Sequence, residues 1–412
     1  MARFAMARFA MPRFAMAACL RGNLRRLAAA SRALLGAALL TASLGCAAAS
    51  CPWPAWDSFK RDTVSADGRV IDASTPQQTT VSEGQAYALF FALVANDRPT
   101  FERLLAWTEN NLAEGDLASR LPAWIWGKRE AAEGKPERWG VLDGNPASDA
   151  DLWIAYALLE AGRLWQERRY TALGTVIARQ VVRQETALLP GLGRTLLPGP
   201  MGFHPSPTMW RLNPSYVPPQ LMRRFAALWP QQPEWIQLLS SSARLLLDTA
   251  PRGFSPDWVE YHGGAKPGFR PDQQTQAEGA YNAIRVYLWA GMLSPQDPLR
   301  APLLKTYRPM ADYTIAQGHP PERVDTRSGT VGPNSGNAGF SAAVAPYLAA
   351  LGETGAAQRQ VERMRKLAAE QPLGYYSQVL ALFALGHLDG LYRFEADGAL
   401  TPAWTATCPA RR

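Results

Sequence analysis

Six segments of the chain are apolar on almost every side of the helix that their spacing predicts. They carry little charge, and each begins with a polar or aromatic residue that follows a loop. The six are SEGQAYALFFALVA, SDADLWIAYALLEAG, NPSYVPPQLMRRFAAL, AYNAIRVYLWAGML, GFSAAVAPYLAAL and YYSQVLALFALG. Between them lie helices with one apolar face, such as PTFERLLAWTENNLAE, YTALGTVIARQVVRQ and AAQRQVERMRKLAAE. A helix that is apolar all round has to be buried, whereas one with a polar face lies at the surface.

The spacing of these segments predicts an all-α fold. Marker residues near their starts are separated by 66, 67, 66, 58 and 36 residues; the markers are Glu83, Asp149, Tyr216, Asn282, Phe340 and Tyr376. Six buried helices, each paired with an amphipathic one, suit an inner ring wrapped by an outer ring, which is an (α/α)6 barrel. No segment alternates convincingly like a strand. Because the repeats run in one direction, we expect the inner N-termini to gather at one end, around a cleft.

Residues 1–50 have the pattern of a targeting segment. They contain seven arginines, no lysine and no acid, followed by an apolar stretch and small residues up to Ser50. The apolar stretch is short and rich in alanine, so no stable membrane span is expected. Cleavage just before Cys51 would leave residues 51–412 as a single domain, exported to the periplasm or secreted. Lipidation at Cys46 is the alternative.

Charge and the rarer residue types exclude several classes of function. After residue 50 the chain is nearly neutral and has no basic stripe, so nucleic acid is not an expected partner. Cleavage would leave two cysteines, Cys51 and Cys408, which in an exported protein form one disulfide between the ends or remain two free thiols. The four histidines share no spacing that suits zinc, so we expect no metal and no cofactor.

Two carboxylates at the starts of apolar segments are candidates for catalysis. Glu83 precedes GQAYALFFAL, which is too apolar for an outer helix, so its side chain is expected to face the cleft. Burial there would raise its pKa and keep it protonated, as a general acid requires. The alternative is a first-turn carboxylate that only faces the helix dipole. In SDADLW we expect Asp149 in the cleft and Asp151 in a structural role, although both could cap the helix.

Aromatic side chains indicate that the cleft binds sugar rings. Trp124 and Trp126 alternate in LPAWIWGK, which we interpret as a loop between helices, where exposed indoles would form flat apolar platforms. Core packing is the alternative for both. Further candidates lie in loops or at helix starts: Tyr216, Asp257, Trp258, Tyr281 and Tyr376. All fourteen tryptophans follow residue 50, which is a mild sign of carbohydrate binding.

Several of these segments resemble glycoside hydrolase family 8. The similarity runs in the correct order through SEGQAYALFFALVANDR, LPAWIWGK, SDADLWIAYALLEAGRLW, LNPSYVPP, GFSPDW and YNAIRVYLWAGM. It extends from CPWPAW at Cys51 to Cys408. The resemblance implies an (α/α)6 barrel and an exported endo-β-1,4-glucanase that hydrolyses cellulose chains with inversion. It is strongest for the branch associated with bacterial cellulose synthesis, which implies the cellulose synthase complex as a further partner.

The resemblance also implies roles for individual residues. Inverting glycosidases use an acid and a base whose carboxyl groups lie about 6.5–9.5 Å apart, with a water between the base and the sugar. Glu83 corresponds to the proton donor. Asp149 corresponds to a signature aspartate described as a nucleophile, or as a group that grips the distorted sugar. Tyr216 corresponds to a tyrosine near the attacking water, and Arg285 to an arginine that borders the cleft.

One position departs from the family pattern. The related cellulases have YDAIR where this chain has YNAIR, so Asn282 occupies the position of the general base, and an amide does not accept a proton at neutral pH. Another carboxylate could act instead. Glu278 lies one turn earlier if EGAYNAIR starts a helix, unless it is a solvated loop residue, and Asp149 could serve twice. Otherwise the chain is a weakened hydrolase that binds or guides glucan, or the change belongs to this chain alone.

Overall fold

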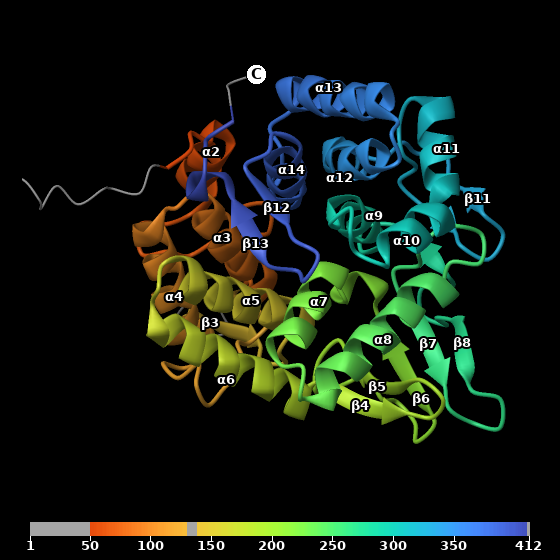
Figure 1. Ribbon diagram of the computed structural model, residues 1–412, viewed down its shortest axis with the longest axis horizontal. Coiled ribbons are helices and arrows are strands. Elements are labelled where there is room, and N and C mark those ends of the chain that lie inside the picture. The colour runs from red at the N-terminus through yellow and green to blue at the C-terminus, as the bar shows by residue number, and fades with distance from the viewer. Residues whose placement is uncertain (1–49, 130–137, 410–412) are drawn as a thin grey trace, which may run out of the picture. The chain divides into compact units, whose positions relative to one another are not determined.

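Six helices form a closed inner ring within residues 50–129 and 138–409, the part of the chain that this computed structural model describes (Figure 1). They are α3 (Ser82–Val94), α5 (Ser148–Leu164), α7 (Pro219–Leu228), α9 (Ala283–Met292), α12 (Ala338–Ala350) and α14 (Tyr375–Leu388). Each helix contacts the next in this order, and α14 contacts α3. The six apolar segments of the sequence are therefore the six helices of the ring.

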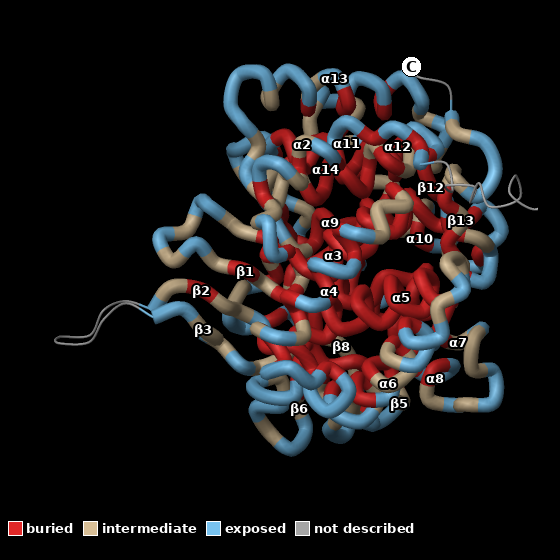
Figure 2. The backbone as a smooth tube through the Cα atoms, turned by 90° about the vertical axis from the view of Figure 1, so that its left-hand side faces the viewer, coloured by how far each residue is buried: buried red, intermediate tan, exposed pale blue. Residues whose placement is uncertain are grey.

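A second set of helices wraps this ring. The outer helices are α4 (Arg98–Leu112), α6 (Arg168–Gln184), α8 (Pro233–Asp248), α10 (Arg300–Thr306), α11 (Arg308–Gln317), α13 (Thr354–Glu370) and α2 (Pro54–Thr63). In turn, α4 packs on α3, α6 on α5, α8 on α7, α10 on α9, α13 on α12 and α2 on α14. Figure 2 shows the inner helices buried and the outer ones exposed on one side. The predicted (α/α)6 barrel is confirmed.

Short strands join the helices, which the prediction of a purely helical chain missed. In the described residues they form five small sheets. These are β1 (Thr80–Val81), β2 (Ile125–Arg129) and β3 (Arg138–Asp143); β4 (Thr186–Leu189) and β5 (Gly193–Leu196); β6 (Met209–Leu212), β7 (Val259–His262) and β8 (Gly268–Pro271); β9 (Glu278–Gly279), β10 (Val324–Asp325) and β11 (Thr330–Val331); and β12 (Tyr392–Phe394) and β13 (Leu400–Pro402). Two short 3-10 helices, η1 (Pro214–Tyr216) and η2 (Ala403–Thr405), complete the elements. Strands of two to six residues are too short for a clear alternating pattern.

Aromatic side chains from four inner helices fill the centre of the ring. The ring centroids of Phe90 and Trp153 lie 5.0 Å apart, and those of Phe91 and Phe383 lie 4.6 Å apart. Trp289 completes the cluster at 5.2 Å from Phe383. Elsewhere, small residues let the helices approach closely. A Cβ on Gly291 of α9 would lie 2.4 Å from the backbone nitrogen of Tyr347 on α12, so glycine is required at that crossing.

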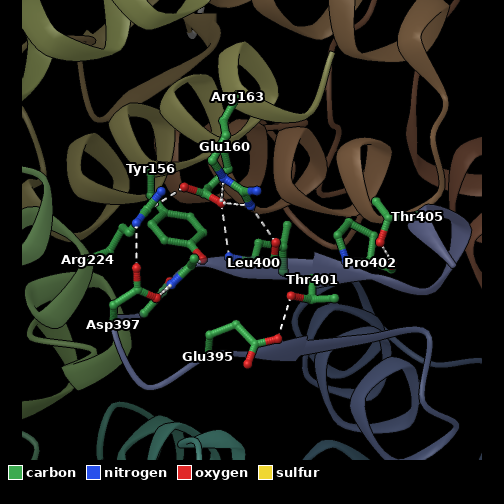
Figure 3. Close-up of polar contacts among 12 residues, drawn as sticks. Tyr156, Glu160, Arg163, Arg224, Glu395, Asp397, Leu400, Thr401, Pro402 and Thr405 are labelled. Atoms are coloured by element: carbon green, nitrogen blue, oxygen red, sulfur yellow. Dashed lines mark hydrogen bonds and ion pairs between the residues drawn. The ribbon is translucent and has the colours of Figure 1, made fainter. Parts of the chain in front are cut away.

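A buried polar network ties the C-terminal hairpin to the ring (Figure 3). Glu160, near the end of α5, is fully buried and accepts hydrogen bonds from Arg163 Nε at 3.0 Å and Arg224 Nε at 2.7 Å. The backbone N–H of Leu400 on β13 donates to the same carboxylate at 3.0 Å. Arg224 also donates to Asp397 at 2.9 Å. Every oxygen of Glu160 thus has a partner, as a buried charge requires.

The two ends of this unit are joined covalently. Cys51 and Cys408 form a disulfide with their Cα atoms 5.3 Å apart, which confirms the predicted pairing and rules out two free thiols. The bridge closes a loop across 357 positions of sequence. Among the described residues, no helix has the length and apolar character needed to cross a bilayer. The predicted targeting segment, with Cys46, lies outside the described residues except for Ser50.

Candidate active site

Glu83 lies in the first turn of α3, at the end of the ring where the inner helices begin. Strand β1 leads directly into α3 and pairs with β2, and the N–H of Ser82 donates to the Trp124 carbonyl at 2.9 Å. This pairing brings the Trp124 indole Nε1 to 3.3 Å from Glu83 Oε1. The Glu83 side chain is only partly exposed, and burial raises its pKa. The positive charge of Arg285 lowers the pKa by less, so the net shift favours the protonated form.

Asp149 lies in the first turn of α5 and is 1% exposed. Its Oδ1 accepts the N–H of Ala150 at 2.9 Å, whereas Oδ2 has no hydrogen-bond partner within the described residues. Arg285 Nη2 is 3.8 Å from that oxygen. Burial, and then the charge of Glu83, raise the pKa of Asp149 to about 8. Because α3 packs on α5 and each acid lies in the first turn of its helix, the two carboxyl groups are at the same end of the ring.

Asn282 is the N-cap of α9, and two donors hold its side-chain oxygen. Arg285 Nη2 donates to Oδ1 at 2.9 Å and Asn213 Nδ2 donates to it at 3.1 Å. The orientation of Asn213 is itself fixed, because its Oδ1 accepts the N–H of Ser215 at 3.0 Å. The Asn282 oxygen is therefore turned toward Arg285, and its NH2 group is the remaining polar end. Asn282 therefore offers a hydrogen-bond donor, not a proton acceptor.

Asp257 supplies the cap that the Asn282 side chain does not. Its Oδ1 accepts three backbone N–H groups, from Ala280 at 2.8 Å, Asn282 at 3.0 Å and Ala283 at 2.7 Å. The side chain is 7% exposed. A carboxylate that binds the first N–H groups of a helix also complements the helix dipole. Asp257 therefore holds the start of α9, and with it the backbone of Asn282, in place.

Glu278 does not share a helix face with Asn282. The segment EGAYNAIR was predicted to start a helix, but Glu278 belongs to β9 and α9 begins only at Ala283. Strand β9 pairs with β10, next to Arg323, and Arg323 Nη1 donates a hydrogen bond to the Glu278 carboxylate at 2.6 Å. The i, i+4 argument for Glu278 as a substitute base was wrong for this reason, because two residues of strand replace the first helical turn.

Four aromatic candidates lie near these groups. Tyr216 is 9% exposed, and the guanidinium of Arg285 lies 5.6 Å from its ring centroid. Trp258 lies 6.1 Å from the ring of Tyr216. Tyr281 is 38% exposed, and its carbonyl accepts a hydrogen bond from the Tyr376 hydroxyl at 2.6 Å. Exposed Trp124, partly exposed Glu83 and exposed Tyr281 leave this end of the ring open to solvent.

Trp124 and Trp126 have different surroundings. Both were predicted in a loop, but LPAWIWGK enters β2, and the pairing of β2 with β3 shifts register between Ile125 and Trp126. Trp124 contacts Glu83, whereas Trp126 packs between Trp107 of α4 and Trp139 of β3, at 5.3 Å and 5.4 Å. The sequence argument singled out Trp126 and missed Trp139, because only the hairpin brings the two indoles together.

The described residues contain no group of three or more histidine, cysteine or acidic side chains that could hold a metal ion. A cavity of about 740 Å³ lies away from the carboxyl groups, between α13, α14 and the disulfide, and Trp53, Val361 and Leu385 are among its lining residues. At the start of the inner helices lie Glu83, Asp149 and Arg285, together with aromatic side chains such as Trp124 and Tyr216.

Carboxyl groups among aromatic side chains, at one end of a ring of paired helices, are suited to the hydrolysis of glycosidic bonds. Residues 32–390 match the family described as Glycosyl hydrolases family 8. A protein named Endoglucanase from Salmonella typhi is 47% identical over 368 residues, which cover 89% of this chain and 95% of that protein. Another from Xanthomonas axonopodis pv. citri (strain 306) is 47% identical over 392 residues, covering 94% and 99%.

A solved structure is similar over nearly the same length. The crystal structure of endo-1,4-D-glucanase from Vibrio fischeri ES114 has a TM-score of 0.81 and 46% sequence identity, and the match covers 86% of this chain and all of that one. The chain belongs to glycoside hydrolase family 8.

Proposed function

We propose that the chain is an endo-β-1,4-glucanase that cleaves cellulose internally and inverts the anomeric carbon. The similar proteins are named endoglucanases, and the similar structure is an endo-1,4-D-glucanase. The single observation that carries the proposal for this chain is Glu83. Its pKa is raised by burial, and it is held by Trp124 at the solvent-exposed end of the ring. A protonated carboxyl beside an exposed indole can meet a glycosidic oxygen whose sugar stacks on the ring.

In the proposed reaction, Glu83 transfers its proton to the glycosidic oxygen as the bond from that oxygen to the anomeric carbon breaks. A water attacks the anomeric carbon from the opposite face, which inverts the configuration. Asp149 and Arg285 bind the sugar next to the bond, and Tyr216 lies beside Arg285 near the water. Trp258, Tyr281 and Tyr376 are proposed to contact neighbouring sugars.

The proton released by the water has no good acceptor at Asn282. The amide oxygen of Asn282 is occupied by Arg285 and Asn213, so its NH2 group can orient a water but not deprotonate it. Asp149, with its pKa raised to about 8, is mostly protonated at neutral pH and is a weak substitute. We therefore propose that the proton passes to solvent and that hydrolysis is slow.

Restoring an acid at position 282 tests this mechanism. In Asn282→Asp one carboxylate oxygen can keep Arg285 and Asn213 while the other takes the proton, so kcat should rise by about 10²–10⁴-fold. The measurement is reducing-end release from carboxymethyl cellulose, with the configuration of the first product followed by NMR. Glu83→Gln should abolish release. Asn110→Asp, at an exposed position of the outer helix α4, makes the same chemical change outside the site and should leave the rate unaltered.

Equal rates for the parent chain, Glu83→Gln and Asn282→Asp would contradict the assignment of the site. If all three bind cellulose and none hydrolyses it, the chain is instead a glucan-binding or guiding protein.

We further propose that residues 1–50 direct export and are removed, so that residues 51–412 act in the periplasm or outside the cell. The Cys51–Cys408 disulfide supports this, since such bridges persist in oxidising compartments. Association with cellulose synthesis, through the synthase complex, is part of the same proposal. Fractionation of cells that express the chain with and without residues 1–50 should place only the former outside the cytoplasm, with an N-terminus at Cys51. Cytoplasmic retention of both would contradict export.

A further inference from the structure

Trp139 is the most exposed tryptophan among the large apolar side chains that the structure leaves open to solvent. It lies on β3 and is 47% exposed. Figure 2 shows the β2–β3 hairpin extending away from the helices of the ring. A large indole face in water is unfavourable unless something binds there, which makes an exposed, ordered tryptophan a common mark of a binding surface.

The side chains beneath Trp139 form a rigid support. The indole of Trp126 stacks on it, with centroids 5.4 Å apart and planes inclined by 19°. The guanidinium of Arg69 lies 4.5 Å from the Trp126 ring and 4.9 Å from the Trp139 ring. Trp107 of α4 holds the far side of Trp126 at 5.3 Å in an edge-to-face contact. The contacts with Trp126 and Arg69 restrict the orientation of the Trp139 ring, and Trp107 in turn restricts that of Trp126.

Arg69 is itself fixed in this position. Its side chain is 8% exposed, and Arg69 Nε donates to Thr80 Oγ1 at 2.8 Å. A second hydrogen bond joins Arg69 to the Gln78 carbonyl. A buried cation that is hydrogen-bonded on one side and packed against indoles on the other does not move freely. The ordering of Trp139 is therefore achieved before any ligand binds, which lowers the entropic cost of binding.

The hairpin connects this platform to the start of α3. Trp126 pairs with Thr80 of β1, and Glu83 follows β1 directly. Trp139 pairs with Lys128, four residues beyond Trp124. At about 3.3 Å per residue, that is about 13 Å along β2 from the indole that contacts Glu83. Trp139 therefore lies on the sheet whose strand β1 leads into α3 and Glu83, but outside the group of residues around Glu83.

We propose that Trp139 is a surface site for a β-1,4-glucan chain, separate from the residues that cleave it. This inference rests on the proposed function, which supplies the class of ligand. A glucosyl ring presents a flat face of C–H groups, and an exposed indole of the same size stacks on that face. Trp126 and Arg69 act as positioning residues under the platform. The surface holds polymer near Glu83, and a short oligosaccharide that fills only the catalytic site gains nothing from it.

Binding to insoluble cellulose tests the proposal in a background where hydrolysis is blocked. Glu83→Gln protein is mixed with regenerated amorphous cellulose, the cellulose is sedimented, and the free protein is measured over a range of concentrations. Adding Trp139→Ala should weaken binding about 3- to 10-fold, while Trp139→Phe should retain most of it because the flat ring remains. Leu188→Ala removes another exposed apolar side chain, 65% exposed on β4, and should have no effect. Thermal unfolding of each variant shows that it is folded.

A second measurement separates this site from the catalytic one. In the chain with an intact Glu83, Trp139→Ala should lower turnover of amorphous cellulose about 3- to 10-fold. It should leave kcat/KM for cellotriose within about 2-fold, because a trisaccharide bound across Glu83 is too short to reach Trp139. Equal cellulose binding by Trp139→Ala and Leu188→Ala would overturn the proposal, as would an equal loss on polymer and cellotriose. Failure of the proposed function looks different, because the unmodified chain and Asn282→Asp would then hydrolyse neither substrate.

Discussion

Helix α5 carries buried acids at both ends, and the hydrogen-bond partners of these acids differ between the two ends. Near the C-terminal end, Glu160 has donors on both oxygens, from two arginines and a backbone N–H (Figure 3). Near the N-terminal end, one oxygen of Asp149 has no hydrogen-bond donor among the described residues, and Asp151 has only another acid, Glu185, beside it. The first end is arranged for stability. The second leaves polar groups unsatisfied, which is costly and is characteristic of functional sites.

A second acid accounts for part of the unsatisfied end. Asp151 and Glu185, at the end of α6, are both fully buried, and burial raises the pKa of each well above its usual range. Two such groups in contact are stable only if one carboxyl is protonated and donates to the other, because two adjacent buried charges repel. We therefore expect the pair to keep one proton, so that it holds one negative charge near Asp149 and not two.

Breaking the satisfied end should have the largest effect on stability. In Glu160→Ala the buried Arg224, 7% exposed, keeps Asp397 but loses the buried one of its two carboxylate partners, and the backbone N–H of Leu400 loses its acceptor, so the free energy of unfolding should fall by about 3–5 kcal/mol. Denaturant unfolding measures this change. Rates of reducing-end release per folded molecule should be unaltered, since Glu160 lies away from Glu83. Glu362→Ala on the exposed face of α13 is the control, and a similar small change in both variants would contradict the comparison.

Changing the unsatisfied end should reverse the pattern. Asp149→Asn replaces a buried carboxyl that has one unpartnered oxygen, so stability should stay the same or rise by about 0.5–2 kcal/mol. In the Asn282→Asp background, where we expect faster turnover, kcat should fall by at least about 10²-fold because the group proposed to hold the sugar is lost. A loss of stability as large as that of Glu160→Ala would mean that Asp149 is structural.

The Asp151–Glu185 pair should be visible as a pH dependence. Burial raises the pKa of both acids in the folded protein. Below the pKa of the unfolded acids, near about 4, the pair therefore has no effect on the free energy of unfolding. As the pH rises from there toward the pKa of the folded pair, the free energy of unfolding falls. Asp151→Asn supplies a permanent donor to Glu185 and removes one titrating group. The slope of unfolding free energy against pH, measured from pH 5 to 8, should become less negative by about 1.4 kcal/mol per pH unit at most. An unchanged slope would show that the pair does not hold the proton.

Sequence patterns predicted some parts of the site and missed others for a definable reason. The candidates Glu83, Asp149 and Arg285 stand at predicted positions on inner helices, and the structure brings them together. Glu278 and Trp126 were judged by spacing along the chain, but short strands place them elsewhere. Trp139 had no local signal, since its significance depends on Trp126 from a different strand. Short strand pairings follow contacts that residue spacing does not reveal.

The sequence by itself determined the ring of paired helices, because helical periodicity is a property of neighbouring residues. It also provided one cysteine near each end of the domain, Cys51 and Cys408, for the disulfide. Tertiary structure alone decided how Asn282 is oriented, through Asn213, which lies 69 residues away, and where Glu278 points, through Arg323, 45 residues away. Hydrogen bonds of this kind depend on distance and angle in three dimensions, and no local pattern encodes them. Whether the free end of the Asn282 amide donates or accepts a hydrogen bond is therefore a property of the fold.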